Sequence, residues 1–509
     1  MNATKKNWVG RNLKSRQLGR LALAALALQA ACSREICSGI DTAKGCLALR
    51  LGGNEDRQQV HVEVRDAFGQ RLARLQTEAS PEDLVEVQFP RPAEARCLRV
   101  WVGSGSSRKT AVARIAAGPD GRLTRSVQLS QPPAQATFSP REQKLAGNGR
   151  GVAIGRVPGF DAPVLVVGSE PAAPARSTVQ FFQPDGASLG KEVYERLEVE
   201  AAPYPIVLAG NTDEEAVLGA GRSPFDAVGT SPTVFRSAGK GGTGYIRSGQ
   251  VLSLSGTRQA VFLAGAHLDN DRQIDWVINW HDPVNRNSGT QIVLSGGTAQ
   301  MMPLPEAGDS VLSTVLLADL NVDGLPDIAR SMGNKIGLYL NQKEILGQFV
   351  ASRDLLSSAT LTPLGLTAAD LNGDDRPDLA AAINSNNGLG EQALQVYLAD
   401  GAAPGAFRPV ATATVGLRPR VAVAADLNGD VLDDVVTASF GTPPSPTAPT
   451  VLYGSASERF DTQDLSLELS AGFDLAAGDL NGDCQADLAL VSEQRDTVYL
   501  LMNSSLMTQ

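Results

Sequence analysis

Residues 368–382, AADLNGDDRPDLAAA, decide the fold of this chain. Four aspartates and one asparagine fall between Asp370 and Asp378, and small apolar residues flank them on both sides. Carboxylates that lie close together repel one another and resist removal from water. A chain that places so many negative charges between two apolar segments must offset their mutual repulsion. The surrounding sequence indicates how.

This stretch belongs to a series of repeats. Complete copies begin at Ala318 (ADLNVDGLPDIA), Ala369 (ADLNGDDRPDLA), Ala425 (ADLNGDVLDDVV) and Gly478 (GDLNGDCQADLA), and a weaker copy, AHLDNDRQIDWV, begins at Ala266. Two further segments, AGNTDEEAVLGA and GRVPGFDAPVLVV, lack the acids at the first and ninth positions but keep the apolar strand that follows. The ninth loop positions are 51 to 58 residues apart, at residues 163, 217, 275, 327, 378, 434 and 487. A period near fifty residues, with short strands and turns, is typical of a β-propeller.

The repeats predict an all-β chain with a seven-bladed β-propeller over residues 136–509. Each repeat has room for four short strands, and the small apolar residues before the acidic loop suit an innermost strand near a crowded axis. The chain ends in DTVYLLMNS, which predicts a third strand of the last blade. We therefore expect residues 131–140 to act as a linker and to supply the strand that closes the ring.

The N-terminal part predicts a separate small domain. Residues 33–130 contain alternating segments such as QQVHVEVRD and ARCLRVWVGSG, separated by turn residues. This alternation is typical of a small antiparallel β-sandwich. No catalytic constellation is visible in this part of the sequence.

Residues 1–31 predict an export signal. Six basic residues and no acid fall in the first twenty residues, followed by the apolar run LALAALALQAAC, which is too short to span a bilayer. The ending LQAAC resembles a bacterial lipobox, in which Cys32 would be lipidated, although Gln29 stands where that pattern usually has a leucine-like residue. We expect an exported cell-envelope protein, an outer-membrane or cell-surface lipoprotein, with simple secretion as the alternative.

The charge excludes nucleic acid as the expected partner. The formal charge of the whole chain is −10, and removing the six basic residues of 1–31 brings it to −16. A nucleic-acid binder needs a basic face. In an oxidising compartment two of the next three cysteines are expected to pair, as Cys37–Cys46 or Cys46–Cys97, and the sequence does not choose between these pairs.

The repeated loop has the pattern of a calcium site. In D-x-N-x-D-x-x-x-D, the side chains at positions 1, 3 and 5, the backbone carbonyl at position 7 and the carboxylate at position 9 offer the oxygen ligands that Ca²⁺ prefers. The expected ligands of the complete copies are Asp319, Asn321, Asp323, Leu325 and Asp327; Asp370, Asn372, Asp374, Arg376 and Asp378; Asp426, Asn428, Asp430, Leu432 and Asp434; and Asp479, Asn481, Asp483, Gln485 and Asp487.

The weaker copy offers fewer ligands. It has His267 at position 1, with Asp269, Asp271 and Asp275 after it. The sixth position also varies between the complete copies, where it holds Gly324, Asp375, Val431 or Cys484. A β-branched valine at positive φ is costly. Three copies have glycine at position 4 instead, so we expect their turn to be made differently.

These residues resemble the FG-GAP and VCBS-type repeats of bacterial secreted proteins and the propeller of integrin α-subunits. The resemblance covers residues 136–509 and depends on the four copies of DLN(G/V)D…D. It implies seven blades, calcium as a scaffold ion in the C-terminal blades, and binding to another macromolecule. The literal FG and GAP elements are weak here, so the resemblance is to the wider repeat family.

The calcium loops are expected to be structural, with a partner on the opposite face of the propeller. That face includes the loop NWHDPVNRNSG (279–289), in which Trp280, His281 and Asp282 form the candidate ligand-binding group. The alternative is that Trp276 and Trp280 simply pack between blades.

The sequence thus predicts an extracellular binding or adhesion module for a protein or glycan. An enzyme that processes polysaccharides on the same scaffold is the alternative. Paired carboxylates in an axial pocket, or a basic residue beside an acid, would favour the enzyme, and an open face without convergent acids would favour the binding module.

Overall fold

The structure is a computed structural model in which every described element is a β-strand. Described are residues 44–52, 58–80, 83–90, 95–103, 107–115, 122–171, 176–185, 188–192, 196–199, 204–210, 217–220, 232–238, 245–247, 252, 254–269, 271, 273–295, 300–307, 313–358, 360–385, 392–439, 448–467, 472–492 and 495–505. Residues 1–31 and Cys32 lie outside this set. No helix that could cross a bilayer occurs in the described part of the chain.

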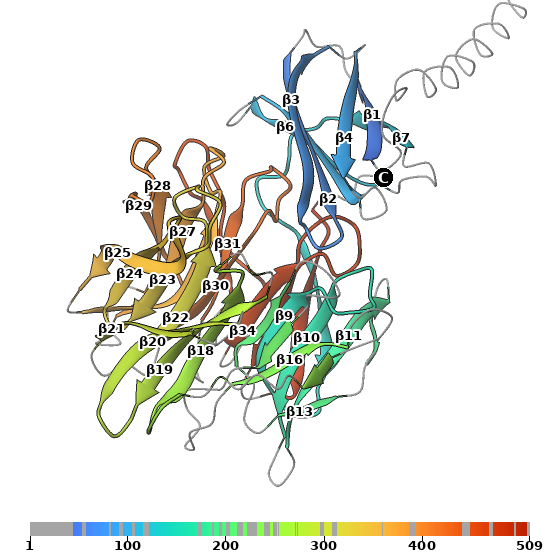
Figure 1. Cartoon of the computed structure of the whole chain (residues 1–509). Helices are drawn as coiled ribbons and strands as arrows, with labels where there is room; N and C mark the ends of the chain where they lie inside the picture. Colours follow the sequence, from blue (N-terminus) through green and yellow to red (C-terminus); the bar gives the residue numbers. More distant parts are fainter. Residues whose placement is uncertain are drawn as a thin grey trace, which may run out of the picture. The chain divides into compact units, whose positions relative to one another are not determined.

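The chain divides into two compact units, and the first contains seven strands in two sheets (Figure 1). One sheet has the order β4-β1-β7 and the other β3-β2-β5-β6. The strands are β1 (Lys44–Gly52), β2 (Gln58–Asp66), β3 (Arg71–Ala79), β4 (Leu84–Pro90), β5 (Ala95–Val102), β6 (Lys109–Arg114) and β7 (Arg122–Gln128). A single core of alternating apolar residues, including Leu47, Val62 and Leu98, joins the two sheets. This is the arrangement of a small β-sandwich.

The second unit consists, in its described residues, of seven antiparallel sheets (Figure 1), numbered here sheets 1 to 7 along the chain. Sheet 1 contains β9 (Asn148–Gly155), β10 (Val164–Glu170), β11 (Ser177–Asp185), β12 (Ser188–Glu192) and β13 (Leu197–Val199); sheet 2 contains β14 (Ile206–Ala209), β15 (Val217–Ala220), β16 (Thr233–Ser237) and β17 (Tyr245–Arg247); sheet 3 contains β18 (Gln259–Ala266), β19 (Asp275–Asp282), β20 (Asn287–Leu294) and β21 (Gln300–Ala307).

Sheets 4 to 7 repeat the same four-strand order. Sheet 4 contains β22 (Ser313–Ala318), β23 (Asp327–Met332), β24 (Lys335–Gln342) and β25 (Ile345–Ser357); sheet 5 contains β26 (Leu361–Ala369), β27 (Asp378–Ser385), β28 (Ala393–Ala399) and β29 (Phe407–Thr414); sheet 6 contains β30 (Pro419–Ala425), β31 (Asp434–Ser439), β32 (Thr450–Leu452) and β33 (Thr462–Asp464); sheet 7 contains β34 (Gly472–Gly478), β35 (Asp487–Ser492), β36 (Thr497–Asn503) and β8 (Phe138–Lys144).

The sheets close into a ring. Each first strand contacts the first strand of the next sheet, from β9 through β34 and back to β9. Seven apolar clusters of the described residues each join two neighbouring sheets, and one of them joins Val491 of sheet 7 to Val152 of sheet 1. Since these sheets pack against neighbours on both faces, the second strands β23, β27, β31 and β35 are almost wholly buried. This is a β-propeller, as the repeats predict.

The last sheet contains a strand from before the first repeat. β8 pairs antiparallel with β36, with Arg141 opposite Leu500 and Lys144 opposite Thr497. The ring is therefore joined by backbone hydrogen bonds between the beginning and the end of the repeat region.

Candidate cation loops and an axial cavity

The four complete acidic loops occupy equivalent places in sheets 4 to 7. Each loop begins directly after the first strand of its sheet and ends where the second strand begins, so the position-9 aspartates Asp327, Asp378, Asp434 and Asp487 are the first residues of β23, β27, β31 and β35. The loops therefore lie at the C-terminal ends of the innermost strands.

The position-9 aspartate is a buried anchor. Asp327 has no exposed surface, and its Oδ2 accepts the N–H of Leu320 at 2.9 Å while its Oδ1 accepts the N–H of Asn341, in β24, at 2.8 Å. One carboxylate thus ties the loop to the second and third strands. The same pair of bonds recurs at Asp378, Asp434 and Asp487, and at Asp275 of sheet 3.

The side chains at positions 1, 3 and 5 turn inward onto the loop backbone. In sheet 4, Asp319 accepts the N–H groups of Asp323 and Gly324, Asn321 accepts that of Asp323, and Asp323 accepts that of Leu325 at position 7. The loops of sheets 5, 6 and 7 repeat this pattern. The asparagine and aspartate oxygens therefore gather on the inner side of one tight turn.

The turn is made the same way in all four copies, which corrects the expectation of a different turn. Position 6 has positive φ throughout, at 90° for Gly324, 64° for Asp375, 72° for Val431 and 73° for Cys484. The cause is the aspartate at position 1, because its Oδ2 accepts the position-6 N–H in every copy. Position 4 also has positive φ, and Val322 stands there where the other copies have glycine.

The choice between the two expected disulfide pairs stays open, because the partner of Cys46 is not fixed by the described residues. Cys46, Cys97 and Cys484 are each disulfide-bonded, and Cys37 lies outside the described residues. The involvement of Cys484, at position 6 of the sheet 7 loop, gave no signal in the sequence.

The loops hold more negative charge than the fold accommodates well. Burial, and to a smaller degree the neighbouring carboxylates of Asp374 and Asp370, raise the pKa of Asp378 to about 7. Burial likewise raises the pKa of Asp327 to about 6 and that of Asp487 to about 7. A hard cation fits this donor set, since it is made of oxygen atoms and would neutralise carboxylates that otherwise repel one another.

In the loop of sheet 3, three carboxylates converge more closely than in the complete loops. Oxygens of Asp269, Asp271 and Asp275 lie within 4.8 Å of one another, and no other three carboxylates of the described residues approach so closely. The Oδ2 atom of Asp271 is buried and has no hydrogen-bond partner. His267 Nδ1 lies 3.0 Å from the Gln273 carbonyl oxygen, so positions 1 and 7 contact each other directly. These residues could hold a metal ion.

The proposed ligand-binding group of sheet 3 is buried. Trp280, His281 and Asp282 are 2%, 8% and 4% exposed, so the expectation that they project from the surface is wrong. Asp282 accepts hydrogen bonds from Thr257, Val284 and Asn285 and fixes the turn after β19. Trp276 packs over Gly219 of sheet 2, where a Cβ atom would lie 2.7 Å from its ring. Packing between and within sheets accounts for these residues.

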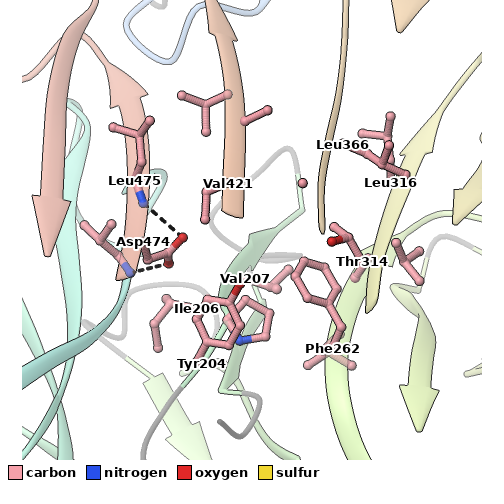
Figure 2. Close-up of a pocket in the computed structure, with 18 of the residues that line it drawn as sticks. Tyr204, Ile206, Val207, Phe262, Thr314, Leu316, Leu366, Val421, Asp474 and Leu475 are labelled. Atoms are coloured by element: carbon pink, nitrogen blue, oxygen red, sulfur yellow. Dashed lines mark hydrogen bonds between the residues drawn. The ribbon is translucent and has the colours of Figure 1, made fainter. Parts of the chain in front are cut away.

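A cavity of about 370 Å³ lies among the innermost strands of the ring (Figure 2). Strands or flanking residues of all seven sheets line it, and most of the lining is aliphatic. Its polar residues are Tyr204, Thr314, Arg420 and Asp474. A basic residue therefore does lie beside an acid on the axis, a combination that no linear motif indicates because the two come from different repeats.

Comparisons with known proteins support the repeat family. Residues 319–381 match the FG-GAP-like repeat family. No curated protein matches the chain. One solved structure, described as "Crystal structure of BBS1N in complex with ARL6DN, soaked with lead", has a TM-score of 0.44 and 11% identity, and the match covers 72% of this chain and 98% of that one.

Proposed function

We propose that this chain is an exported, calcium-stabilised β-propeller of FG-GAP-like repeats that binds a protein or glycan partner, and that Cys32 anchors it to the cell envelope by a lipid. The match of residues 319–381 to the FG-GAP-like repeat family supports the repeat assignment. The observation that carries this proposal is the position-9 aspartate. In five consecutive sheets it is the buried first residue of the second strand and accepts an N–H from the third strand or from a residue just after it, so a cation beside it would act on the scaffold. Calcium then stabilises the molecule, and the partner binds at the end away from the loops.

Calcium is proposed over magnesium because of the donor set. Each loop offers several carboxylates, an amide oxygen and a backbone carbonyl in one turn, which suits the six to eight oxygens that Ca²⁺ takes. Mg²⁺ prefers a strict octahedron and keeps its waters. We expect calcium to raise the melting temperature and magnesium to raise it much less.

A matched pair of variants tests the ligand assignment. Asp374→Asn alters position 5 of the sheet 5 loop, whereas Asp375→Asn alters position 6 and removes the same charge. Asparagine tolerates the positive φ of Asp375, so the control keeps the turn. Asp374→Asn should weaken calcium binding at one site by on the order of tenfold in calorimetry, and Asp375→Asn should change it little. Equal weakening by both variants would contradict the assignment, because only net charge would then matter.

The binding role needs its own experiment. The mature chain, kept in calcium, would be applied to a glycan array and used to capture proteins from cell-surface extracts. We expect a specific partner whose binding is lost in chelator only together with the fold. Binding that chelator abolishes while the circular dichroism and melting curves stay unchanged would show that calcium itself bridges the partner, against the scaffold role.

The alternative is an enzyme that processes polysaccharides, and one observation favours it: Arg420 and Asp474 both line the axial cavity. The lining argues against a polysaccharide substrate, because a sugar polymer presents many hydroxyl groups and this cavity offers four polar side chains among aliphatic walls. Release of reducing or unsaturated sugar ends from a polysaccharide panel, lost in Asp474→Asn, would establish the enzyme.

A further inference from the structure

The axial cavity has the volume and the kind of lining that a small-molecule site requires. Its volume of about 370 Å³ lies in the lower part of the range of roughly 300–1,000 Å³ typical of small-molecule sites. Such sites combine apolar walls with a few convergent polar groups. The cavity meets both conditions, independently of the cation loops and of the partner proposed above.

The polar groups share one end of the cavity. Thr314, Arg420 and Asp474 each stand five or six residues before the first acidic position of their own sheets, near the beginning of an innermost strand. Since the sheets repeat around one axis, equivalent positions lie at the same level. In Figure 2, Asp474, Tyr204 and Thr314 lie below Leu316, Leu366 and Leu475, on the side where Ile206 and Phe262 also lie. This polar end is therefore opposite to the cation loops.

Asp474 is held by the backbone. Its Oδ2 accepts the N–H of Val152 in the neighbouring sheet at 2.9 Å, and its Oδ1 accepts the N–H of Leu475 at 3.0 Å (Figure 2). Burial raises the pKa of Asp474 to about 7, although these two bonds and the charge of Arg420 lower it. Its negative charge is therefore partial near neutral pH.

Arg420 supplies the positive charge of the polar end. Its guanidinium carbon lies 5.4 Å from the centre of the Tyr204 ring. Burial raises the pKa of Tyr204 to about 12, so its hydroxyl stays protonated and can donate a hydrogen bond. The planar fork of N–H groups of an arginine matches the two oxygens of a carboxylate.

We propose that the axial cavity binds a small organic acid with an apolar body, its carboxylate held by Arg420 and Tyr204 and its body packed against Leu316, Leu366 and Val421. The guanidinium of Arg420 and the phenol hydroxyl of Tyr204 bind the acidic group of the ligand, and the aliphatic walls bind its apolar body. A cationic ligand meets the guanidinium unfavourably, and a sugar leaves most of its hydroxyls without partners.

Octanoate is a suitable probe, with octanol and octylamine as neutral and cationic controls of the same chain length. The full mature chain in calcium would be studied by thermal melting and isothermal titration calorimetry. We expect octanoate to bind and to raise the melting temperature, since a ligand of the folded state stabilises it. Octanol and octylamine should do neither. No octanoate binding, or equal binding of all three compounds, would overturn the proposal.

Variants separate binding from folding. Arg420→Gln should weaken octanoate binding by on the order of tenfold to a hundredfold, the usual effect of losing a charged hydrogen bond, while the matched variant Arg418→Gln, at an exposed position two residues away, should not. If Arg420→Gln does not fold, Leu316→Trp fills the apolar part of the cavity without touching the polar end and should abolish binding. Octanoate binding that survives both changes would place it elsewhere. Calcium should raise the melting temperature of Leu316→Trp as much as that of the unmodified chain. A failure of the octanoate proposal is therefore distinguishable from a failure of the calcium proposal.

Discussion

At the scale of single residues, the cation loops contain backbone strain. It can be tested because the same loop position holds valine in one copy and glycine in another. Val431 occupies position 6 at φ 72°, where Gly324 stands in the sheet 4 loop at φ 90°. A β-branched residue in this region is costly, typically by about 1–3 kcal/mol. Val431→Gly should therefore stabilise the protein, less the roughly 0.5–1 kcal/mol that glycine loses in conformational freedom.

The reciprocal variant is its control. Gly324→Val should destabilise, and the cause would be the backbone alone, because a Cβ atom at Gly324 meets nothing within 4 Å. Chemical denaturation of both variants gives the measurement. Destabilisation by both would show that the turn at Val431 is not strained.

The raised pKa values of the position-9 carboxylates predict that, without cations, the protein is more stable at low pH than at neutral pH. Burial raises the pKa values of Asp378 and Asp487 to about 7, above about 3.9 in an unfolded chain. A raised pKa means that the folded state binds the proton more tightly, so this contribution to stability is complete below about pH 4 and is lost as the pH rises through 7. In chelator, the melting temperature should fall between pH 5 and pH 8, and calcium should restore more stability at pH 8 than at pH 5. A calcium effect that shrinks as the pH rises would contradict this.

At the scale of strands and loops, neighbouring sheets are joined through their acidic loops. The side-chain amide of Asn503, at the end of β36, donates to the carbonyl of Leu427 in the sheet 6 loop at 2.7 Å and to that of Ala486 at 3.1 Å. Asn341 does the same between sheets 4 and 3, through Leu268 and Pro326. The loops of sheets 3 and 6 are thus each stabilised by the sheet that follows.

Removing this link should weaken the ring. Asn503→Ala leaves the buried carbonyl of Leu427 and the half-buried carbonyl of Ala486 without this partner, and a buried group left unsatisfied costs roughly 1–3 kcal/mol. Gln143→Ala on β8 is the control, because its amide donates to an exposed carbonyl. Urea unfolding should show a clear loss for Asn503→Ala and little change for Gln143→Ala. Similar small losses in both would mean that water replaces the link.

The sequence predicts the acidic loops and the strands that flank them, because their residues recur at a regular interval. The acids, their spacing and the small residues before them indicated a propeller, because like charge recurs at one interval and between buried strands. The same reasoning failed for Trp280, His281 and Asp282, since a polar and aromatic group beside turn residues gives the same pattern whether it is exposed or anchors a buried turn. The axial group of Tyr204, Arg420 and Asp474 was invisible, because it is assembled from three different sheets.

At the scale of the whole molecule, the ring transmits the stabilisation by calcium from the sheets that carry acidic loops to other sheets of the second unit. Four consecutive sheets carry complete loops, and sheet 7 is completed by β8 from before the first repeat. Because β8 pairs with β36 and sheet 7 packs against sheet 1, loosening sheet 7 also releases β8 and the cluster that Val491 shares with Val152. The loss of the cations should therefore spread from sheets 4 to 7 into sheet 1.

Hydrogen exchange with mass spectrometry can follow this spread. In excess chelator the melting temperature of the propeller should fall, because a ligand of the folded state has been removed. Exchange should rise first in β22–β36 and in β8, next in β9, and least in β14–β17, whose sequence lacks the complete D-x-N-x-D-x-x-x-D pattern. The strands of the first unit are the internal control, since they should keep their protection throughout. Uniform exchange in chelator and in calcium, with an unchanged melting curve, would show that the ring is stable without ions and that the acidic loops are held by their own hydrogen bonds alone.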